Sequence, residues 1–575
     1  KKVKNKKRAA NKHPGLIMLE IDGLAKEILD EAIKKGYMPT LKRWIENKTH
    51  TLKEWETDLS SQTGASQAGI LHGNNKDIIA YRWVEKENNN KIIVSSNFSH
   101  APLIEQKISD GNGLLSDKGA SRANMFSGDS DDFIFTSSQI IELNKLYNKT
   151  WYSVFTTSNS FQRIFVLFLW DILKELKSQI VHKIKNIQPR MKRGIVYATL
   201  RAGGNVFLRE VVTETLAGDI LNGEINSAYA TYVGYDEVAH HSGIRDNDVW
   251  SVLKEIDLEI NRLENAESIS KRPYEFVILS DHGQGNGATF KQRYGITLGN
   301  FVRRFLPEDM KSLRTDEESD HFRNSYIPKN ESIENIREKM DNIKNHDIFE
   351  EYESLQNIKE KSIDFLKIDE LYKSEQIQTL RKKYSDSLDY IRGYEASQHT
   401  TKKASDSELI VLGSGNLGLI YLTQWKHRLT YEEIISLFPD LIPGLVKHPG
   451  IGFILVNSLA NGGMVIGKNG IYYLESDEII GENPLADFGK NASKHLKRHN
   501  TFKNMPDILV NSFYDPESGD ICAFEELIGS HGGLGGTQTK PFILYPSDWD
   551  CPDELVGAKS IYDLLKNGMK KLKEE

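Results

Sequence analysis

Short apolar runs, each closed by turn residues, recur along the chain and predict buried strands. The clearest runs are residues 16–21, 228–233, 274–279 and 541–545, with further core-like runs at 408–412 and 452–456. Helical spacing of apolar positions covers residues 25–48, with a break at Pro39, and returns over residues 250–265. Because strands and helices alternate, we predict an α/β fold: a mostly parallel central sheet with helices on both faces, interrupted by insertions.

The segments between these elements differ in composition, and we divide the chain accordingly. An α/β core is expected in three parts, at residues 14–85, 201–305 and 406–575; a basic tail covers 1–13, an insertion or cap with an amphipathic helix covers 86–200, and a charged helical insertion covers 306–405. Within the third core part, Asn469-Gly470 predicts a hairpin over residues 463–474. The charged insertion fits a lid or partner-binding arm, although its charge pattern favours a solvated helical hairpin.

Residues 161–187 predict a long helix with an apolar face and basic residues such as Lys177 and Lys183. A helix of this kind lies in a membrane interface when its apolar face meets lipid. The pattern equally fits a surface helix whose apolar face packs on the core while its basic rim is solvated. We favour this second interpretation because it is the commoner one in globular proteins.

Composition narrows the possible functions. Of the 575 residues, 39% are hydrophobic and 27% are charged, as in an ordinary soluble globular protein. The formal net charge of −7 gives no reason to expect nucleic-acid binding. No apolar run reaches the roughly 18 residues that a membrane span needs. Because Cys522 and Cys551 are the only cysteines, a bound metal must be held by Asp and His.

The first eight residues are dense in lysine and arginine. Such a run occurs beside a membrane span or on an anionic surface. A solvated, disordered tail has the same composition, so both interpretations remain open.

The polar stretch at residues 58–73 carries the first candidate chemistry, because it is a small-residue turn that leads into a predicted helix closed by Gly73. A hydroxyl at the start of a helix faces unpaired N–H groups and the positive end of the helix dipole, which favour an alkoxide or a phosphate. Thr63 is therefore a candidate nucleophile, although Ser and Thr at such positions usually serve as helix caps. A base or a metal must activate its hydroxyl.

Ligand-type residues follow the predicted strands at their carboxyl ends, where ligands collect in open α/β sheets. They are Asp22, the pair Asp236 and His240, and Asp281-His282, with His531 in a glycine-rich loop beside a further strand. Carboxylate and imidazole ligands suit zinc first, with manganese as a harder alternative.

This order of motifs resembles the alkaline phosphatase superfamily, and within it the type I phosphodiesterase/nucleotide pyrophosphatase branch. The family's strand Asp, nucleophile helix, Asp-x-x-x-His, Asp-His and late His-Gly all occur in order within residues 15–546. The resemblance implies two divalent metals, one held by Asp22, Thr63, Asp281 and His282 and the other by Asp236, His240 and His531. It also implies that Thr63 attacks phosphorus, expels an alcohol or phosphate, and forms a phospho-threonine that water hydrolyses with overall retention.

Two details depart from the family pattern. The Phe-Pro that commonly follows the family's threonine is Gly64-Ala65 here, which leaves the shape of the leaving-group pocket open. The family's Asn, which helps to bind the phosphoryl oxygen, has no clear counterpart, and we consider Asn74, Asn75 and then Arg82.

Ser61 and Ser66 are rival hydroxyls on the same turn. The family pattern nevertheless places the nucleophile at Thr63.

The expected function is thus a metal-dependent phosphodiesterase or phosphatase acting on a nucleotide, a phospholipid headgroup or a wall polymer. A phosphoglycerol-type transferase on membrane or cell-wall polymers is the alternative. A non-catalytic surface binding protein on a phosphatase scaffold is the alternative from another class. Similarity to bacterial membrane-anchored members of the superfamily implies an extracytoplasmic enzyme whose anchoring segment is missing from this chain.

Overall fold

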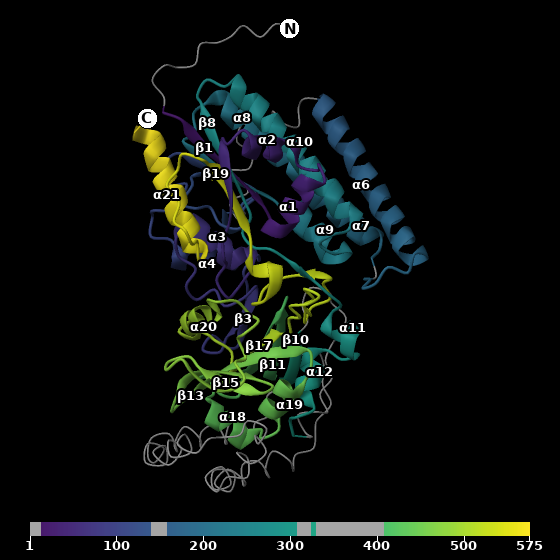
Figure 1. Ribbon diagram of the computed structural model, residues 1–575, viewed down its shortest axis with the longest axis vertical. Coiled ribbons are helices and arrows are strands. Elements are labelled where there is room, and N and C mark those ends of the chain that lie inside the picture. The colour runs from purple at the N-terminus through teal and green to yellow at the C-terminus, as the bar shows by residue number, and fades with distance from the viewer. Residues whose placement is uncertain (1–12, 140–157, 192, 308–323, 329–406, 575) are drawn as a thin grey trace.

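The computed structural model describes residues 13–139, 158–191, 193–307, 324–328 and 407–574. Within these ranges the chain builds two large sheets, one above the other in Figure 1. Nearly all of the expected basic tail and of the expected charged helical insertion lies outside the described residues. No helix in the described ranges is both long enough and apolar enough to cross a membrane.

The first sheet has seven strands in the order β2-β19-β8-β1-β7-β5-β6. They are β1 (Gly15–Ile21), β2 (His50–Glu54), β5 (Gly119–Arg122), β6 (Asp132–Ile134), β7 (Ser227–Tyr232), β8 (Tyr274–Leu279) and β19 (Phe542–Pro546). From β8 to β6 the neighbours run parallel, whereas β19 is antiparallel to both β8 and β2. The four clearest apolar runs correspond to β1, β7, β8 and β19, so the predicted mostly parallel sheet is confirmed.

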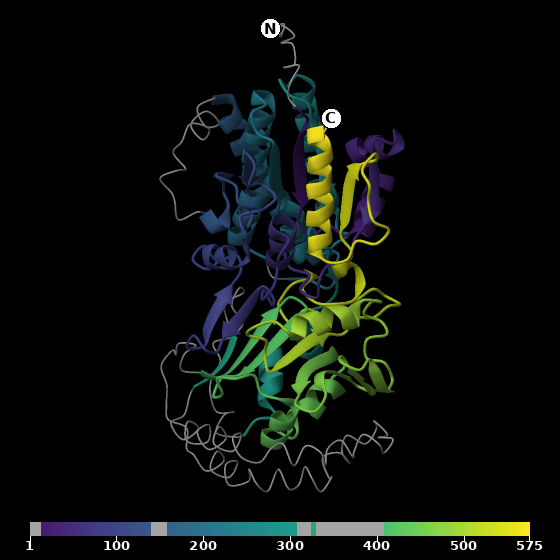
Figure 2. The ribbon, with the colours of Figure 1, turned by 90° about the vertical axis from the view of Figure 1, so that its left-hand side faces the viewer.

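The central strand β1 shows why helices cover both faces of this sheet. Its side chains alternate: Leu16 and Met18 join one core cluster, whereas Ile17 and Leu19 join another. One face carries α3 (Thr63–His72), α4 (Ala101–Ile108) and α21 (Ala558–Glu574), and the other carries α1 (Lys26–Lys34), α2 (Pro39–Glu46), α8 (Arg209–Asn222), α9 (Gly234–Ser242) and α10 (Asn247–Ser268). Figure 2 shows α21 lying along the first of these faces. A strand buried on both faces needs a nearly continuous apolar run, which made β1 recognisable in the sequence.

The second sheet has eight antiparallel strands in the order β10-β11-β12-β17-β13-β14-β15-β16. They are β10 (Asn324–Pro328), β11 (Ser407–Ser414), β12 (Leu417–Leu422), β13 (Ile451–Ser458), β14 (Gly462–Gly467), β15 (Gly470–Tyr473), β16 (Glu478–Gly481) and β17 (Ile508–Ser512). Its helices are α12 (Leu298–Arg303), α18 (Tyr431–Leu437), α19 (Leu441–Lys447) and α20 (Ala492–Asn500), and α11 (Phe290–Tyr294) leads into this half. The predicted strands at 408–412 and 452–456 are β11 and β13, and β14 pairs with β15 as the predicted hairpin.

The residues expected as an insertion or cap contribute to the first sheet. The short strands β5 and β6 extend it beyond β7, while β3 (Arg82–Glu85) and β4 (Lys91–Val94) form a separate hairpin. The sequence of β5, Gly-Ala-Ser-Arg, has no apolar run. Its place is set by pairing with β7 and not by hydrophobic pattern, so the strand signal was absent from the sequence.

The helix predicted over residues 161–187 is α6 (Ser158–Ile184), the outermost helix beside α7 (Ile195–Ala202) in Figure 1. Its apolar side chains, such as Trp170 and Leu173, are exposed, whereas Asp171 and Glu175 are buried. Arg201 of α7 pairs with both carboxylates, with its Nε 3.3 Å from Asp171 Oδ2. The core-facing interpretation of this helix is therefore wrong, because buried ion pairs turn its charged side inward.

Candidate metal centre

Asp22, Asp281 and His282 meet because β1 and β8 are parallel neighbours. The register pairs Glu20 with Leu279, so both strands end at the same level and the residues that follow them lie side by side. The N–H of Gly23 donates to Asp281 Oδ1 at 3.2 Å and ties the two turns together. His282 Nε2 lies 3.5 Å from Asp22 Oδ1 and 3.3 Å from Asp281 Oδ2.

Asp236 and His240 come from α9, which follows β7 on the other side of β1. Their four-residue spacing places both on one face of the helix. His240 Nε2 lies 2.9 Å from Asp236 Oδ2. The sequence-predicted pair therefore points at the same sheet edge as Asp22.

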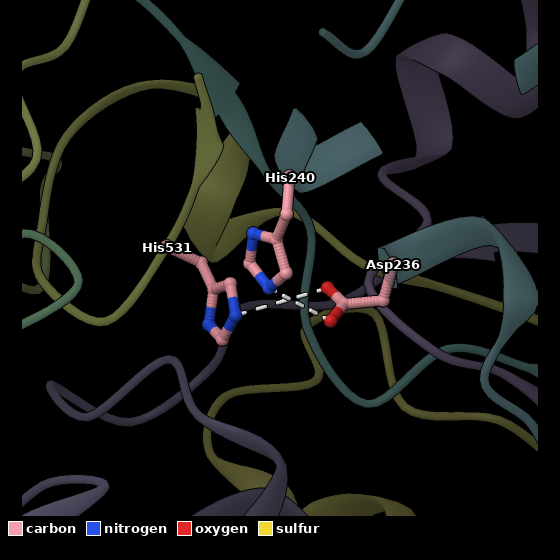
Figure 3. A group of neighbouring side chains, drawn as sticks. All are labelled: Asp236, His240 and His531. Atoms are coloured by element: carbon pink, nitrogen blue, oxygen red, sulfur yellow. Dashed lines mark ion pairs between the residues drawn. The ribbon is translucent and has the colours of Figure 1, made fainter. Parts of the chain in front are cut away.

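His531 arrives from a distant part of the chain through a small two-stranded sheet. The strand β18 (Gly529–Ser530) pairs with β9 (Gly285–Asn286), which begins three residues after His282. His531 Nε2 lies 3.7 Å from Asp236 Oδ1, and its ring stacks on that of His282 with centroids 3.8 Å apart. Figure 3 shows His240 and His531 both turned toward the Asp236 carboxylate.

Backbone carbonyl groups orient the three imidazoles in the same way. His240 Nδ1 lies 2.7 Å from Gly529 O, His282 Nδ1 lies 3.0 Å from Gly283 O, and His531 Nδ1 lies 2.7 Å from Ser61 O. A carbonyl oxygen can accept a hydrogen bond but cannot donate one, so each Nδ1 carries the proton and is the donor. Each Nε2 is thereby left to face the carboxylates, the tautomer and orientation that metal-binding histidines need.

Thr63 is the first residue of α3 and lies against this cluster. Its Oγ1 is 3.1 Å from His282 Nε2 and 3.4 Å from Asp22 Oδ1. The Thr63 hydroxyl is thus next to the side chains of two sequence-predicted ligands, at the positive end of a helix.

The rival hydroxyls have other surroundings. Ser61 is fully buried, and its Oγ donates to Gly533 O while it accepts from the N–H of Gly532, both at 2.9 Å. Ser61 therefore clamps the loop that carries His531. Ser66 is buried within α3.

The three tentative substrate-binding residues are engaged elsewhere. Asn74 donates to Ile108 O, and Asn75 donates to Asp58 Oδ2 and accepts from Arg498. Arg82 pairs with Glu525. None of these contacts of Asn74, Asn75 and Arg82 is with a residue of the cluster.

Two residues that the sequence interpretation passed over support the cluster from behind. Gln284 donates to the main-chain and side-chain oxygens of Asp236. Glu20, fully buried in β1, accepts hydrogen bonds from Gln67 of α3 and from Tyr229. In the sequence, Glu20 could have been noticed as a single acidic residue inside an apolar strand. Gln284 could have been noticed only because it is close to Asp281-His282 in the sequence.

The cluster has the donor set of a cation site. Three overlapping groups of ligand atoms, each within 4.8 Å of one another, are Asp236 with His240 and His531, Asp22 with Asp236 and His282, and Glu20 with Asp22 and Asp281. Asp281 Oδ2 is fully buried without a hydrogen-bond partner. No lysine or arginine in the described part of the chain forms an ion pair with Asp22, Asp236 or Asp281. Divalent cations fit this arrangement, because they would supply the missing positive charge.

The pKa values show the same need for positive charge. Burial raises the pKa of Asp281 to about 7, and the charge of Asp236 adds to the rise. Burial opposes a charge on His240, but the adjacent Asp236 raises the pKa of His240 to about 9. Burial lowers the pKa of His282 to about 4 and that of His531 to about 3. Protons on carboxyl and imidazole groups would compete with a metal here, so metal affinity should depend on pH.

Comparison with known proteins assigns the chain to a family. The model of the type I phosphodiesterase/nucleotide pyrophosphatase family matches residues 16–432, which is most of the chain and includes Thr63 and the strand-end motifs. The chain belongs to this family, a branch of the alkaline phosphatase superfamily, and the sequence-based recognition is confirmed. It is accordingly an enzyme of the phosphodiesterase/pyrophosphatase type that acts on phosphate esters. Among curated proteins, no relative matches.

Solved structures with a similar course of the chain include phosphonoacetate hydrolase from Sinorhizobium meliloti 1021 in complex with phosphonoformate, at 11% identity, 96% coverage of each chain and a TM-score of 0.45. Murine ectonucleotide pyrophosphatase/phosphodiesterase 5, an inactive form in complex with AMP, has 10% identity, 97% coverage of this chain, 95% of its own and a TM-score of 0.42. The human counterpart has 10% identity, the same coverage and a TM-score of 0.41. At these scores the assignment rests on the family match alone.

Proposed function

We propose that this chain hydrolyses phosphate esters at a site for two divalent cations, with Thr63 as the nucleophile. The observation that carries the proposal is the position of Thr63 Oγ1, at the N-terminus of α3 and within 3.4 Å of both His282 Nε2 and Asp22 Oδ1. Family membership supplies the reaction class, and the converged Asp and His side chains support the cofactor.

The seven side chains would divide between two cations. Asp22, Thr63, Asp281 and His282 would hold one, and Asp236, His240 and His531 would hold the other. We favour zinc because three imidazoles join the carboxylates, with manganese as the alternative. When bound, such ions lower the pKa of a coordinated hydroxyl and neutralise charge on the phosphoryl group.

The chain's own groups would then carry out two displacements. Thr63 Oγ1 loses its proton to solvent and forms a bond to phosphorus as the bond to the leaving oxygen breaks and that oxygen takes up a proton; the N–H groups at the start of α3 would face the phosphoryl oxygens. Water next loses a proton and forms a bond to phosphorus, and the bond from phosphorus to Thr63 Oγ1 breaks as Oγ1 regains a proton. Two inversions give net retention. Throughout, the carbonyl groups of Gly529, Gly283 and Ser61 keep the imidazoles oriented.

The test is hydrolysis of a p-nitrophenyl phosphodiester and the matching monoester by the full chain with added zinc or manganese. Thr63→Ala should lower turnover by at least about 1,000-fold, because it removes the nucleophile. Thr63→Ser, which keeps a hydroxyl, should retain measurable turnover. The ratio of the two ester rates decides between diester and monoester preference.

Three outcomes would count against the proposal. Activity that survives in Thr63→Ala would remove Thr63 as the nucleophile. Turnover that is unaffected by chelation would remove the cations. A folded, metal-loaded protein without turnover on either ester would favour transfer between lipid-linked substrates or the binding-protein alternative.

A further inference from the structure

The helix α6 is built with its charged side inward and its apolar side outward. Asp171, Glu175 and His182 are nearly fully buried. They pair with residues of other segments: Arg201 contacts Asp171 and Glu175, and Asp246 Oδ2 lies 3.0 Å from His182 Nε2. These contacts fix which side of the helix faces solvent.

The outward side is an apolar stripe, interrupted by Lys177 between Leu173 and Ile180. Its residues, between 45% and 77% exposed, are Phe165, Val166, Leu169, Trp170, Leu173, Ile180 and Ile184. Their spacing of three, four or seven positions keeps them on one face over most of the 27-residue helix. Ile195 and Leu200 of the adjacent α7 are exposed as well. Exposed apolar surface of this length marks an interaction site.

Charge indicates what covers this stripe, because its exposed charges are all positive. Lys177, Lys183 and Lys185 are exposed along the same segment, whereas Asp171 and Glu175, the only acids of α6, are buried. Two copies packed through the stripe would bury these lysines with no carboxylate of α6 to pair with. An anionic bilayer surface supplies both an apolar layer for Trp170 and its neighbours and negative headgroups for the lysines.

We propose that α6 docks this enzyme onto an anionic lipid bilayer, lying in the interface with its apolar stripe inserted and its lysines at the headgroups. Such docking goes beyond the hydrolysis proposed above and needs no spanning helix. The docked element is linked, through Arg193 and α7, to α9, the helix that carries Asp236 and His240. Arg193 Nη1, just before α7, donates to Ser242 Oγ of α9 at 2.7 Å, and the Tyr197 ring packs on His241 with centroids 4.0 Å apart.

The experiment is flotation of the full chain with vesicles of phosphatidylcholine alone or mixed with phosphatidylglycerol. The protein should float with the mixed vesicles, less with the neutral ones, and less again at high salt. Trp170→Ser, Leu173→Ser and Ile180→Ser combined should weaken binding by at least about tenfold, because three half-exposed apolar side chains no longer enter the lipid. Lys183→Glu with Lys185→Glu should weaken binding to the mixed vesicles alone.

A matched control replaces three equally exposed apolar residues elsewhere, as Phe98→Ser, Leu258→Ser and Leu459→Ser. This variant should float like the wild type. Near-ultraviolet circular dichroism checks that each variant is folded. If the variant with three apolar substitutions does not fold, the lysine variant tests the proposal in its place.

Failure of the wild type to float, or equal flotation of the folded stripe and control variants, would overturn the proposal. If sedimentation equilibrium shows a dimer that the stripe substitutions dissociate, the proposal is overturned and a second copy of the chain is the occupant of the stripe. Ester turnover is measured separately, so failure of the proposed function would not be mistaken for failure of docking.

Discussion

Ser61→Ala should damage the metal centre although Ser61 is not expected to bind metal. Its hydroxyl joins Gly532 N and Gly533 O, each at 2.9 Å, in a fully buried setting. Removing the hydroxyl leaves a buried N–H and a buried C=O unpaired. At about 1–3 kcal/mol for each unpaired group, the free energy of unfolding should fall by about 2–4 kcal/mol, with some relief from local relaxation.

The same loss should reach His531, whose backbone lies next to Gly532. The Ser61 carbonyl accepts from His531 Nδ1, so a displaced loop would no longer hold the imidazole in place. Loss of a partner that orients a metal ligand costs about 10- to 100-fold in metal affinity. We expect a weakening of this order for zinc.

Ser60→Ala is the matched control, since the neighbouring Ser60 hydroxyl is also buried but has no hydrogen-bond partner. Its removal should change stability by less than about 1 kcal/mol. Denaturant unfolding of the metal-free chain measures stability, and zinc titration against a competing chelator measures affinity. Equal effects of the two substitutions, or unchanged zinc affinity in Ser61→Ala, would refute the idea that the Ser61 hydroxyl holds the His531 loop in place.

Two further outcomes follow from the structure. His499 is buried, which lowers its pKa to about 3, so below the unfolded value of about 6.5 the unfolded chain binds a proton that the folded chain does not. The free energy of unfolding should therefore fall by about 2 kcal/mol between about pH 7 and pH 5 on account of His499. His499→Leu should remove that part of the pH dependence, as measured by denaturant titrations at each pH. An identical pH dependence in the variant would contradict the assignment. Chelation should lower the melting temperature of the zinc-loaded chain, because zinc at about 100 times its dissociation constant adds about 2.7 kcal/mol to the stability of the folded state. His240→Ala should reduce the shift on chelation, and a wild type whose melting ignores chelator and zinc alike would argue against a metal centre.

The sequence by itself determined the central strands of the first sheet and the order of the chemical groups that follow them. Strands buried on both faces must be apolar throughout, so β1, β7 and β8 were visible as runs, and the polar residues after them had to meet at one sheet edge. The motif order then pointed to the family that the match confirms.

Only the tertiary structure decided how distant segments complete the site. The pairing of β18 with β9 brings His531 to Asp236, and the Ser61 hydroxyl turns out to hold that loop. Both depend on hydrogen bonds between groups more than 200 residues apart, which leave no periodic signal in the sequence.

The tertiary structure also decided the orientation of α6. Periodicity shows that a helix has an apolar face but not whether that face meets the core. Here Arg201 and Asp246 attract Asp171, Glu175 and His182 inward, and the apolar face is left outside. Buried ion pairs between segments, which hydropathy does not register, set the direction of this helix.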